Sequence, residues 1–291
     1  MRLRAMAKIN LGLDVTNKRA DGYHEVRMVM QTIRMYDQLN MEVTATAGIK
    51  METNLSYLPV NENNLVCKAA KLLMDEFAIK QGLDIKLKKV IPVAAGMAGG
   101  SSDAAAAMVG VNRIFDLGLS TSELMERAVA IGADVPYCIM RGTALAEGIG
   151  EKLTALPSAP ECYVLIGKPG ISVSTKFVYG NLKIDEIKRH PDIDTLVAAI
   201  KENDFYKMSN NLGNVLEEVT IPAYPVIEQI KQEMLRAGAV NALMSGSGPT
   251  VFGLFDDKEK AMVAKETLRE SHLAKQVFLT TFFNGGIKHG D

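Results

Sequence analysis

The sequence predicts an α+β protein built from two parts, and three observations support this prediction. The chain has 291 residues, which at roughly 100–200 residues per domain means one large domain or two ordinary ones. It is 47% hydrophobic and 23% charged, a composition typical of a folded globular protein with a buried core. Strand and helix patterns follow one another without strict alternation, which favours α+β over a doubly wound parallel sheet.

In the first part of the chain, strand patterns come before helix patterns. Apolar residues with partial alternation predict strands over residues 3–15, 26–35, 41–46 and 84–90. The pair Asp21-Gly22 supplies a chain reversal between the first two strands. Apolar residues at helical spacing predict helices over residues 62–80 and 122–131. A further helix is expected from Ser101, because Ser and Asp favour helix starts and a run of alanines follows.

Pro157-Ser158-Ala159-Pro160 is the best candidate for a linker, so we expect domains over residues 1–158 and 159–291. Beyond it, the patterns predict strands over residues 163–167, 240–244, 250–255 and 276–282. They predict helices over residues 194–201, 223–237 and 258–270. The uncharged run 237–255 is 19 residues long and reaches the length of a membrane span, but Gly246-Ser247-Gly248-Pro249 would interrupt a helix in lipid. We therefore expect buried strands joined by a loop there, and no membrane partner.

Charge and cysteine content argue against several classes of protein. The chain has 33 Lys and Arg against 34 Asp and Glu, a net charge of −1 that does not suit the neutralisation of nucleic-acid phosphates. Its three cysteines lie far apart, which favours neither a disulfide framework nor a zinc site; they are Cys67, Cys138 and Cys162. The four histidines show no metal-ligand spacing; they are His24, His190, His272 and His289. Charged residues interrupt the N-terminus, so we expect no export signal and a cytoplasmic protein.

The strongest local signal for chemistry is a glycine-rich loop that leads into a predicted helix. It consists of Pro92, Val93, Ala94, Ala95, Gly96, Met97, Ala98, Gly99, Gly100, Ser101 and Ser102. The backbone N–H groups of such a loop and the positive end of the helix dipole suit a polyphosphate. Ser101 or Ser102 could add a hydroxyl donor or a ligand for Mg²⁺. The loop lacks the Lys of a P-loop and the dinucleotide-binding fingerprint, so a flexible loop before an ordinary helix is an equally good interpretation.

Other stretches carry weaker signals when each is taken alone. Ser245, Gly246, Ser247 and Gly248 lie between two predicted strands, where a hairpin turn is the favoured interpretation. Lys8 and Asn10 lie in an apolar strand, and burying them costs free energy unless they are paired. The alternative is an edge strand with Lys8 in water. Asp134, next to Val135-Pro136, is most simply interpreted as a helix cap.

Together these stretches resemble, in their order along the chain, the three motifs of the GHMP small-molecule kinases. The blocks Asp21-Gly22-Tyr23-His24, Gly132-Ala133-Asp134-Val135-Pro136 and Pro169-Gly170 add to the resemblance, which extends from residue 7 to about residue 250. Within this superfamily the match is nearest to the branch that phosphorylates the 2-hydroxyl group of a cytidyl sugar alcohol in the non-mevalonate isoprenoid pathway.

The resemblance implies a fold with an N-terminal ribosomal-S5-domain-2-like lobe and a C-terminal ferredoxin-like lobe. It implies transfer of the γ-phosphoryl group of ATP, with Asp134 as the general base and Lys8 stabilising charge beside it. The glycine-rich loop would surround the ATP phosphates, with residues 245–248 close by. Mg²⁺ is expected as a second cofactor, because the ATP phosphates bring several negative charges together.

The resemblance also assigns residues to the acceptor substrate. Tyr23 would stack on the cytosine base, His24 would read its pairing edge, and Tyr179 would be the opposing ring. Asn10 would bind the diphosphate or the sugar alcohol. The expected partners are therefore two small molecules and no nucleic acid, with the chain a monomer or a homodimer.

Three alternatives remain open beside this interpretation. A superfamily kinase acting on homoserine or mevalonate would have no base to recognise, and Tyr23-His24 argues against it. A non-catalytic metabolite-binding protein on the same fold could lack the Lys or the base, whereas Lys8 and Asp134 are both present. A nucleic-acid-binding module shares the topology of the N-terminal lobe, but the net charge of −1 argues against it.

Overall fold

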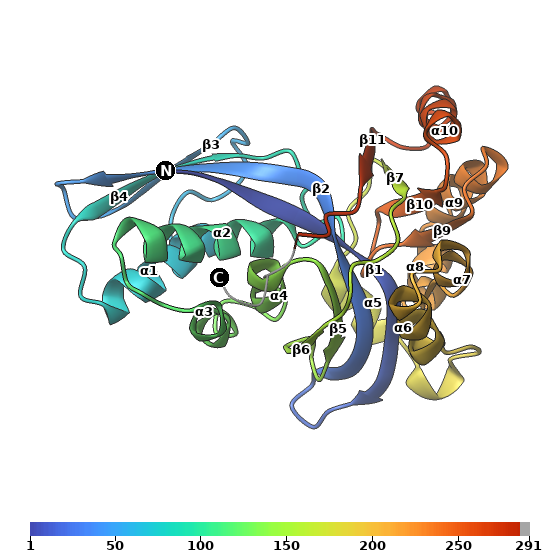
Figure 1. Ribbon diagram of the computed structural model, residues 1–291, viewed down its shortest axis with the longest axis horizontal. Helices are drawn as coiled ribbons and strands as arrows, with labels where there is room; N and C mark the ends of the chain where they lie inside the picture. The colour runs from blue at the N-terminus through green and yellow to red at the C-terminus, as the bar shows by residue number, and fades with distance from the viewer. Residues whose placement is uncertain (286–291) are drawn as a thin grey trace. The chain divides into compact units, whose positions relative to one another are not determined.

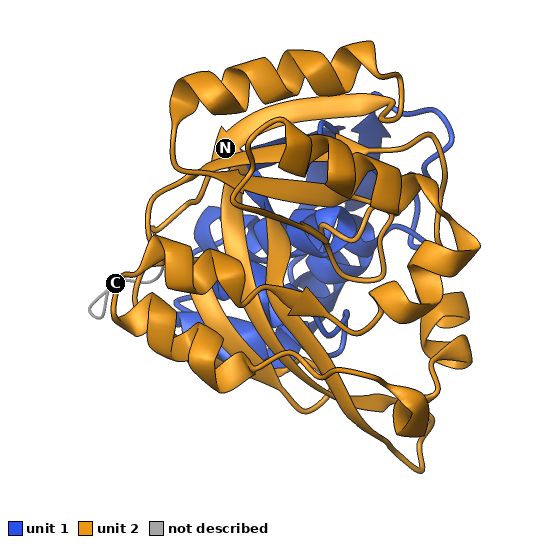
Figure 2. Cartoon of the chain, turned by 90° about the vertical axis from the view of Figure 1, so that its right-hand side faces the viewer, with its two compact units in different colours: residues 1–7, 35–93, 98–141 blue, residues 8–34, 94–97, 142–291 orange. Residues whose placement is uncertain are grey.

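A computed structural model describes residues 1–285, which form two compact units (Figure 2). The first unit comprises residues 1–7, 35–93 and 98–141, and the second unit comprises the rest. Two long strands, β1 (Arg2–Lys18) and β2 (His24–Thr44), contribute residues to both units. The domain boundary expected between residues 158 and 159 stays a prediction. The last residues of the expected C-terminal domain, 286–291, which include His289, lie outside the described residues.

The first unit combines a sheet with four helices. Besides the parts of β1 and β2, its elements are β3 (Gly48–Thr53), α1 (Leu65–Glu76), β4 (Gly82–Lys88), α2 (Gly99–Ile114), α3 (Thr121–Ala128) and α4 (Val135–Met140). Strand β4 pairs antiparallel with β2 and parallel with β3. Helices α1 and α2 pack together and cover one face of this sheet (Figure 1).

A close helix–strand approach fixes α2 on this sheet. A Cβ atom on Gly110 of α2 would lie 2.3 Å from the sulfur of Met41 and 2.7 Å from Leu3 Cδ1. Only glycine fits at this distance, because any side chain would have to displace both neighbours. The start of α2, which carries part of the glycine-rich loop, is thereby held in place.

The second unit contains the remaining elements. They are β5 (Thr143–Glu147), β6 (Lys152–Ala155), β7 (Tyr163–Lys168), α5 (Thr175–Asn181), the 3₁₀-helix η1 (Ile184–Glu186), α6 (Ile193–Lys201), α7 (Phe205–Asn210), β8 (Gly213–Asn214), α8 (Glu217–Ala223), α9 (Val226–Arg236), β9 (Asn241–Met244), β10 (Val251–Phe255), α10 (Lys258–Glu270) and β11 (Gln276–Thr281). Strand β5 pairs with β2 and β6, and β8 pairs in parallel with β1.

A four-stranded antiparallel sheet in the order β11-β7-β10-β9 organises the C-terminal part of this unit. Helix α9 packs on β9 and β10, and α10 packs on β7 and β11. At Gly167 of β7, an added Cβ atom would lie 2.9 Å from Leu268 of α10 and 3.0 Å from Met234 of α9. The two helices therefore meet over the centre of this sheet. The predicted β-β-α-β order of residues 240–282 is confirmed.

The α+β fold class is confirmed, and several predicted boundaries are corrected. The strands predicted over residues 26–35 and 41–46 are one strand, β2, because the polar residues between them alternate in burial and pair with β4. The helix predicted over residues 223–237 is α9, which begins three residues later, at Val226, and ends at Arg236. The shorter helix α8 before it was not predicted. Helix α2 begins at Gly99, two residues before the expected start. The sequence patterns did not predict β3, β5, β6, β8, α4, α5, η1 or α7.

The uncharged run of residues 237–255 is not a single element. It forms β9, a connecting loop and β10, and all five residues of β10 are buried. This confirms the prediction of buried strands joined by a loop. Across residues 1–285, no helix has both the length and the apolar character that crossing a membrane requires.

Candidate active site

Lys8 and Asn10 are neighbours on one face of β1 in the second unit. Their side chains are buried, and Lys8 Nζ donates a hydrogen bond of 2.7 Å to Asn10 Oδ1. The alternative of an edge strand with Lys8 in water is wrong, because β1 lies between β2 and β8 in its sheet. Residues two apart in a strand point to the same side, so the sequence spacing itself brings this ammonium group and this amide together.

The glycine-rich loop has an unusual backbone. Ala94, Gly96 and Ala98 all adopt positive φ, at 50°, 73° and 53°. This region is disfavoured for residues with a Cβ atom, and such strained residues cluster at ligand sites. Alternation of right-handed and left-handed residues turns successive N–H groups toward a common side, which is a geometry suited to anions.

Helix α2 offers uncapped N–H groups directly after this loop. Its N-cap residue is Ala98, and no side chain makes a cap hydrogen bond there. The first N–H groups of a helix have no partner within the helix, and the helix dipole places positive charge at this end. Gly99 and Gly100 are its first two residues, so no side chain of these two covers their N–H donors. The prediction of an anion-binding helix start therefore has the backbone geometry that it needs.

Within the second unit, the Ser245–Gly248 motif contacts the glycine-rich loop. Ser245 Oγ donates a hydrogen bond of 2.9 Å to the carbonyl oxygen of Gly96. The favoured interpretation of this motif as a hairpin turn is also correct, because it joins the antiparallel strands β9 and β10 and Ser245 N donates to Thr250 O at 2.9 Å. A second contact, 3.2 Å from Lys8 N to Met97 O, ties the same loop to β1.

Asp134 lies at the start of α4 in the first unit. It occupies the N-cap position, yet its side chain makes no cap hydrogen bond. The simple interpretation as a helix cap is therefore right about its position and wrong about its carboxylate. The side chain is half-buried, and Pro136 in the first turn of α4 helps to fix where this helix begins.

The residues predicted for the acceptor base lie in the second unit. The rings of His24 and Tyr179 are 5.1 Å apart with an interplanar angle of 45°. Tyr23 is 59% exposed, and its backbone N–H donates to Asp21 Oδ1 at 3.0 Å in the turn before β2. Burial, and then the positive charge of Lys18, hold the pKa of His24 below its usual 6.5. A neutral imidazole can offer one donor and one acceptor, which suits the edge of a base.

The two serines of the loop differ in their surroundings. Ser102 is buried, and its hydroxyl donates a 2.6 Å hydrogen bond to the carbonyl of Met6 within the first unit. Ser101 is half-buried at the same helix start. Among residues 1–285 there is no group of three or more His, Cys, Asp or Glu side chains that could hold a metal ion. Of the two serine hydroxyls predicted as Mg²⁺ ligands, that of Ser102 already donates to a carbonyl group.

A buried ion cluster beneath the start of α2 was not predicted. Lys89 Nζ contacts the carboxylates of Asp37 and, at 2.6 Å, Asp103, and all three side chains are buried. Burial raises the pKa of Asp103 well above its usual value, against the opposing charge of Lys89. A Cβ atom on Gly99 would lie 3.2 Å from Lys89 Nζ, so this cluster directly supports the first turn of α2. The available sequence signal for this cluster was Asp103, an acidic residue in an otherwise apolar predicted helix.

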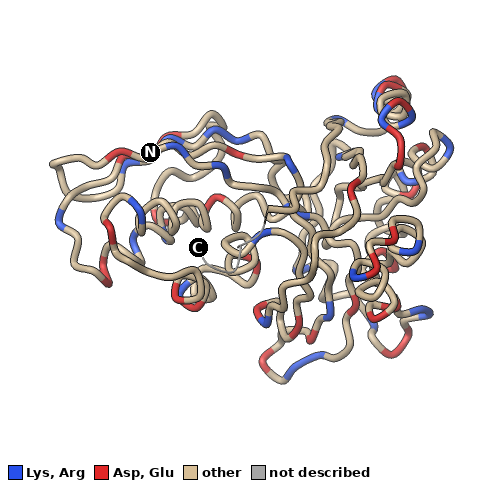
Figure 3. The backbone as a smooth tube through the Cα atoms, in the orientation of Figure 1, with Lys and Arg blue, Asp and Glu red and all other residues tan. Residues whose placement is uncertain are grey.

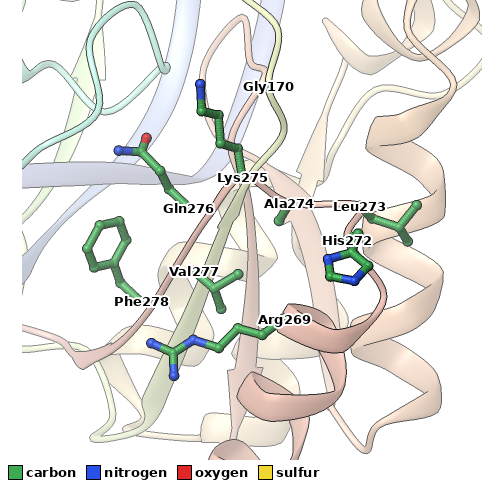
Figure 4. Close-up of a pocket in the computed structure, with 9 residues that line it drawn as sticks. All are labelled: Gly170, Arg269, His272, Leu273, Ala274, Lys275, Gln276, Val277 and Phe278. Carbon is green, nitrogen blue, oxygen red and sulfur yellow. The ribbon is translucent and has the colours of Figure 1, made fainter.

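A cavity of about 680 Å³ lies elsewhere in the second unit, between the end of α10 and the start of β11 (Figure 4). Arg269, His272 and Lys275 are among its lining residues. None of the predicted catalytic or binding residues lines it. Figure 3 shows Lys and Arg positions interspersed with Asp and Glu positions along residues 1–285.

Comparisons with known proteins agree with these features. The family model "GHMP kinases N terminal domain" matches residues 64–142, and "GHMP kinases C terminal" matches residues 190–273. The chain is 55% identical to a 4-diphosphocytidyl-2-C-methyl-D-erythritol kinase of Lachnospira eligens, over 97% of this chain and 98% of that one. It is 57% identical to the protein of the same name from Lachnoclostridium phytofermentans, over 97% of each chain.

Solved structures give the same result. A crystal structure of 4-(cytidine 5'-diphospho)-2C-methyl-D-erythritol kinase matches with a TM-score of 0.84 and 29% identity, over 98% of this chain and all of that one. A homoserine kinase from Cytophaga hutchinsonii matches with a TM-score of 0.74 at 20% identity, over 97% of this chain and 94% of that one, and shares the fold. Fold and sequence together define a small-molecule kinase that uses ATP. The chain belongs to the GHMP kinase family.

Proposed function

We propose that this kinase transfers the γ-phosphoryl group of ATP to the 2-hydroxyl group of 4-diphosphocytidyl-2-C-methyl-D-erythritol, in the non-mevalonate isoprenoid pathway. The single observation that carries the choice of acceptor is the His24–Tyr179 ring pair beside the exposed Tyr23. Two aromatic groups and a neutral imidazole suit a nucleobase, whereas a simple sugar alcohol or amino acid needs none of them. The names of relatives at 55% and 57% identity support the same acceptor.

In the proposed reaction, Asp134 is the general base. A bond forms between the acceptor oxygen and the γ-phosphorus as the bond from that phosphorus to the bridging oxygen of ADP breaks, and Asp134 takes the hydroxyl proton. Lys8 stabilises the negative charge on the transferred group and on Asp134. Asn10, which already accepts a hydrogen bond from Lys8, orients the Lys8 ammonium group and binds the diphosphate or the sugar alcohol.

The glycine-rich loop binds the ATP phosphates in this proposal. Its positive-φ residues and the uncapped start of α2 supply backbone donors, and Ser245–Gly248 support the loop from the other side. Mg²⁺, coordinated by phosphate oxygens, water and at most Ser101 or Ser102, would neutralise charge on the phosphates when bound. We further propose a cytoplasmic location, since the three cysteines are buried and form no disulfide with one another. The proposed assembly state is a monomer or a homodimer.

Neutral His24 reads cytosine in this proposal. The pairing edge of cytosine presents one donor and two acceptors, whereas uracil has an acceptor in place of the amino donor and an N–H donor in place of the ring-nitrogen acceptor. An imidazole fixed against Tyr179 would therefore discriminate between the two bases. Tyr23 contributes stacking, which is worth roughly 1–3 kcal/mol per base.

The deciding experiment measures ADP release with the cytidyl substrate, its uridyl analogue, homoserine and mevalonate. We expect turnover with the cytidyl substrate alone, and a rise of about 5- to 150-fold in its KM in Tyr23→Ala. The KM for ATP should remain nearly constant in that variant, because adenine is bound elsewhere. Equal turnover of cytidyl and uridyl substrates would remove the cytosine assignment, and turnover of homoserine or mevalonate would replace the acceptor.

A further inference from the structure

A short segment that no motif singled out holds the backbone at the end of β9. Asn214 Nδ2 donates hydrogen bonds of 2.8 Å to the carbonyl oxygens of both Met244 and Gly246. Glu217 Oε1 accepts a hydrogen bond of 2.8 Å from Met244 N. Both backbone groups of Met244 and the carbonyl of Gly246 are therefore fixed by side chains from one turn of chain, residues 214–217.

The two side chains that form this clamp are themselves fixed. Asn214 is buried, its Oδ1 accepts from Leu216 N at 3.0 Å, and it lies opposite Leu13 where β8 pairs with β1. Glu217 Oε2 accepts a hydrogen bond of 2.6 Å from Lys231 Nζ. Glu217 and Lys231 are half-buried. A polar network that is largely shielded from water and has these members paired favours one geometry, because displacement breaks its hydrogen bonds.

The clamped backbone is the part that supports the glycine-rich loop. Ser245 lies between the two clamped residues, and its Oγ donates to Gly96 O at 2.9 Å. A Cβ atom on Gly96 would lie 2.0 Å from the carbonyl oxygen of Ser245, and one on Gly246 would lie 3.2 Å from Gly96 O. The two segments are thus in direct backbone contact, so a shift of residues 244–246 would displace Gly96.

We propose that Asn214 and Glu217 are positioning residues for nucleotide binding, which they control through Ser245 and Gly96 without touching the nucleotide. The inference rests on the proposed function in one respect, namely that the glycine-rich loop binds the ATP phosphates. Misplacing a binding group by about 1 Å can cost about 10²-fold, so a small shift of this loop has a measurable effect.

The chemistry of the clamp requires an amide at position 214. Its Nδ2 faces two carbonyl oxygens, and a carboxylate oxygen in the same place would face them with like partial charge and no proton to donate. Asn214→Asp changes one donor atom and keeps the size of the side chain. Asn241→Asp is the matched control, because Asn241 lies at the other end of β9 and makes hydrogen bonds of the same kind. Its Nδ2 donates to Ser209 O at 2.7 Å, and its Oδ1 accepts from Ala242 N.

The dissociation constant of ATP, measured by calorimetry without acceptor, is the main readout. We expect Asn214→Asp to raise it about tenfold or more and Asn241→Asp to change it less than about twofold, although both variants lower Tm. Equal effects of the two variants on ATP binding would overturn the proposal, because the role of Asn214 would then be general stability.

Glu217 provides an independent arm that holds even if Asn214→Asp does not fold. Glu217→Gln keeps the acceptor for Met244 N and should leave ATP affinity within about twofold of wild type, whereas Glu217→Ala should weaken it severalfold. Loss of affinity in both variants to the same extent would assign the effect to the Lys231 ion pair and overturn the positioning role.

A double-mutant cycle tests the route from the clamp to the loop. If Asn214 acts through Ser245, the combined Asn214→Ala and Ser245→Ala variant should bind ATP about as weakly as the weaker single variant. If the fold-changes in ATP dissociation constant of the two single variants instead multiply in the double variant, this route is overturned. A wild-type chain that binds ATP but does not phosphorylate the cytidyl substrate would refute the proposed acceptor and leave the clamp standing. A wild-type chain that does not bind ATP would refute both.

Discussion

Ser245 and Gly96 lie in backbone contact although 149 residues separate them, with the Ser245 hydroxyl donating to the Gly96 carbonyl at 2.9 Å. Gly96 has a φ of 73°, and a Cβ atom there would lie 2.0 Å from the Ser245 carbonyl oxygen. The dihedral angle favours glycine at this position, as it does at Ala94 and Ala98, and the lack of space beside Ser245 requires it.

Substitution of Gly96 should be costly for both stability and nucleotide binding. Gly96→Ala places a methyl group where the Ser245 carbonyl lies, and it adds left-handed strain, so the free energy of unfolding should fall by about 2 kcal/mol or more. Gly100→Ala is the matched control for stability, because its Cβ atom would meet only Leu65 Cδ1 at 3.7 Å. Denaturant unfolding should show Gly100→Ala unchanged or more stable by about 0.5–1 kcal/mol. Comparable losses in the two variants would contradict the contact with Ser245.

The catalytic assignment of Lys8 and Asp134 is tested by separating turnover from binding. Asp134→Asn and Lys8→Ala should each lower kcat by about 10²-fold or more, the usual contribution of an acid–base or charge-stabilising group. Asp134→Asn should keep near wild-type ATP affinity, because the role proposed for this carboxylate is to take the proton of the acceptor hydroxyl and not to bind the nucleotide. Near-normal kcat in both variants would remove the pair from the mechanism.

The state of His24 predicts how acceptor binding depends on pH. Its pKa lies below 6.5 in the folded chain, so the imidazole is neutral at pH 7 and gains a proton only as pH falls through that lowered value. The KM for the cytidyl substrate should therefore rise below the His24 pKa, by about tenfold per pH unit, while the KM for ATP changes little.

The free energy of unfolding should also become less favourable to the folded state as pH falls. A depressed pKa of His24 means that the unfolded chain binds the proton more tightly, so its stabilising contribution is complete above pH 6.5 and is lost as pH falls through the folded-state value. His24→Gln removes the titrating group and should flatten the KM profile. A profile that is unchanged in this variant would assign the pH dependence to another residue.

The buried cluster of Lys89, Asp37 and Asp103 should be essential for folding stability. Lys89→Met leaves two buried carboxylates without their counter-charge, which costs about 3–5 kcal/mol. Lys86→Met on β4 is the control, because Lys86 is exposed, and it should cost less than about 0.5 kcal/mol. Urea unfolding of both variants checks this. A loss below about 1 kcal/mol in Lys89→Met would mean that the cluster contributes little.

The sequence by itself determined the local features of this chain. Residues 8 and 10 share a face of any strand, a glycine-rich loop before a predicted helix suits a phosphate, and the order of three motifs is typical of one kinase family. These signals depend only on spacing along the chain, so they could be read without coordinates. The sequence also predicted the elements with strong periodicity, such as α10, because one apolar face is visible in every turn.

The tertiary structure decided what depends on contacts between distant residues. Whether the Ser245–Gly248 turn was an ordinary hairpin or a support for the loop depended on its contact with Gly96. The Asn214–Glu217 clamp and the Lys89 cluster were not predicted, because an isolated Asn, Glu or Lys shows no sign of burial until its partners are known. Short elements such as β8 and α4 form only because neighbouring chain holds them, since they are too short to be stable or periodic alone.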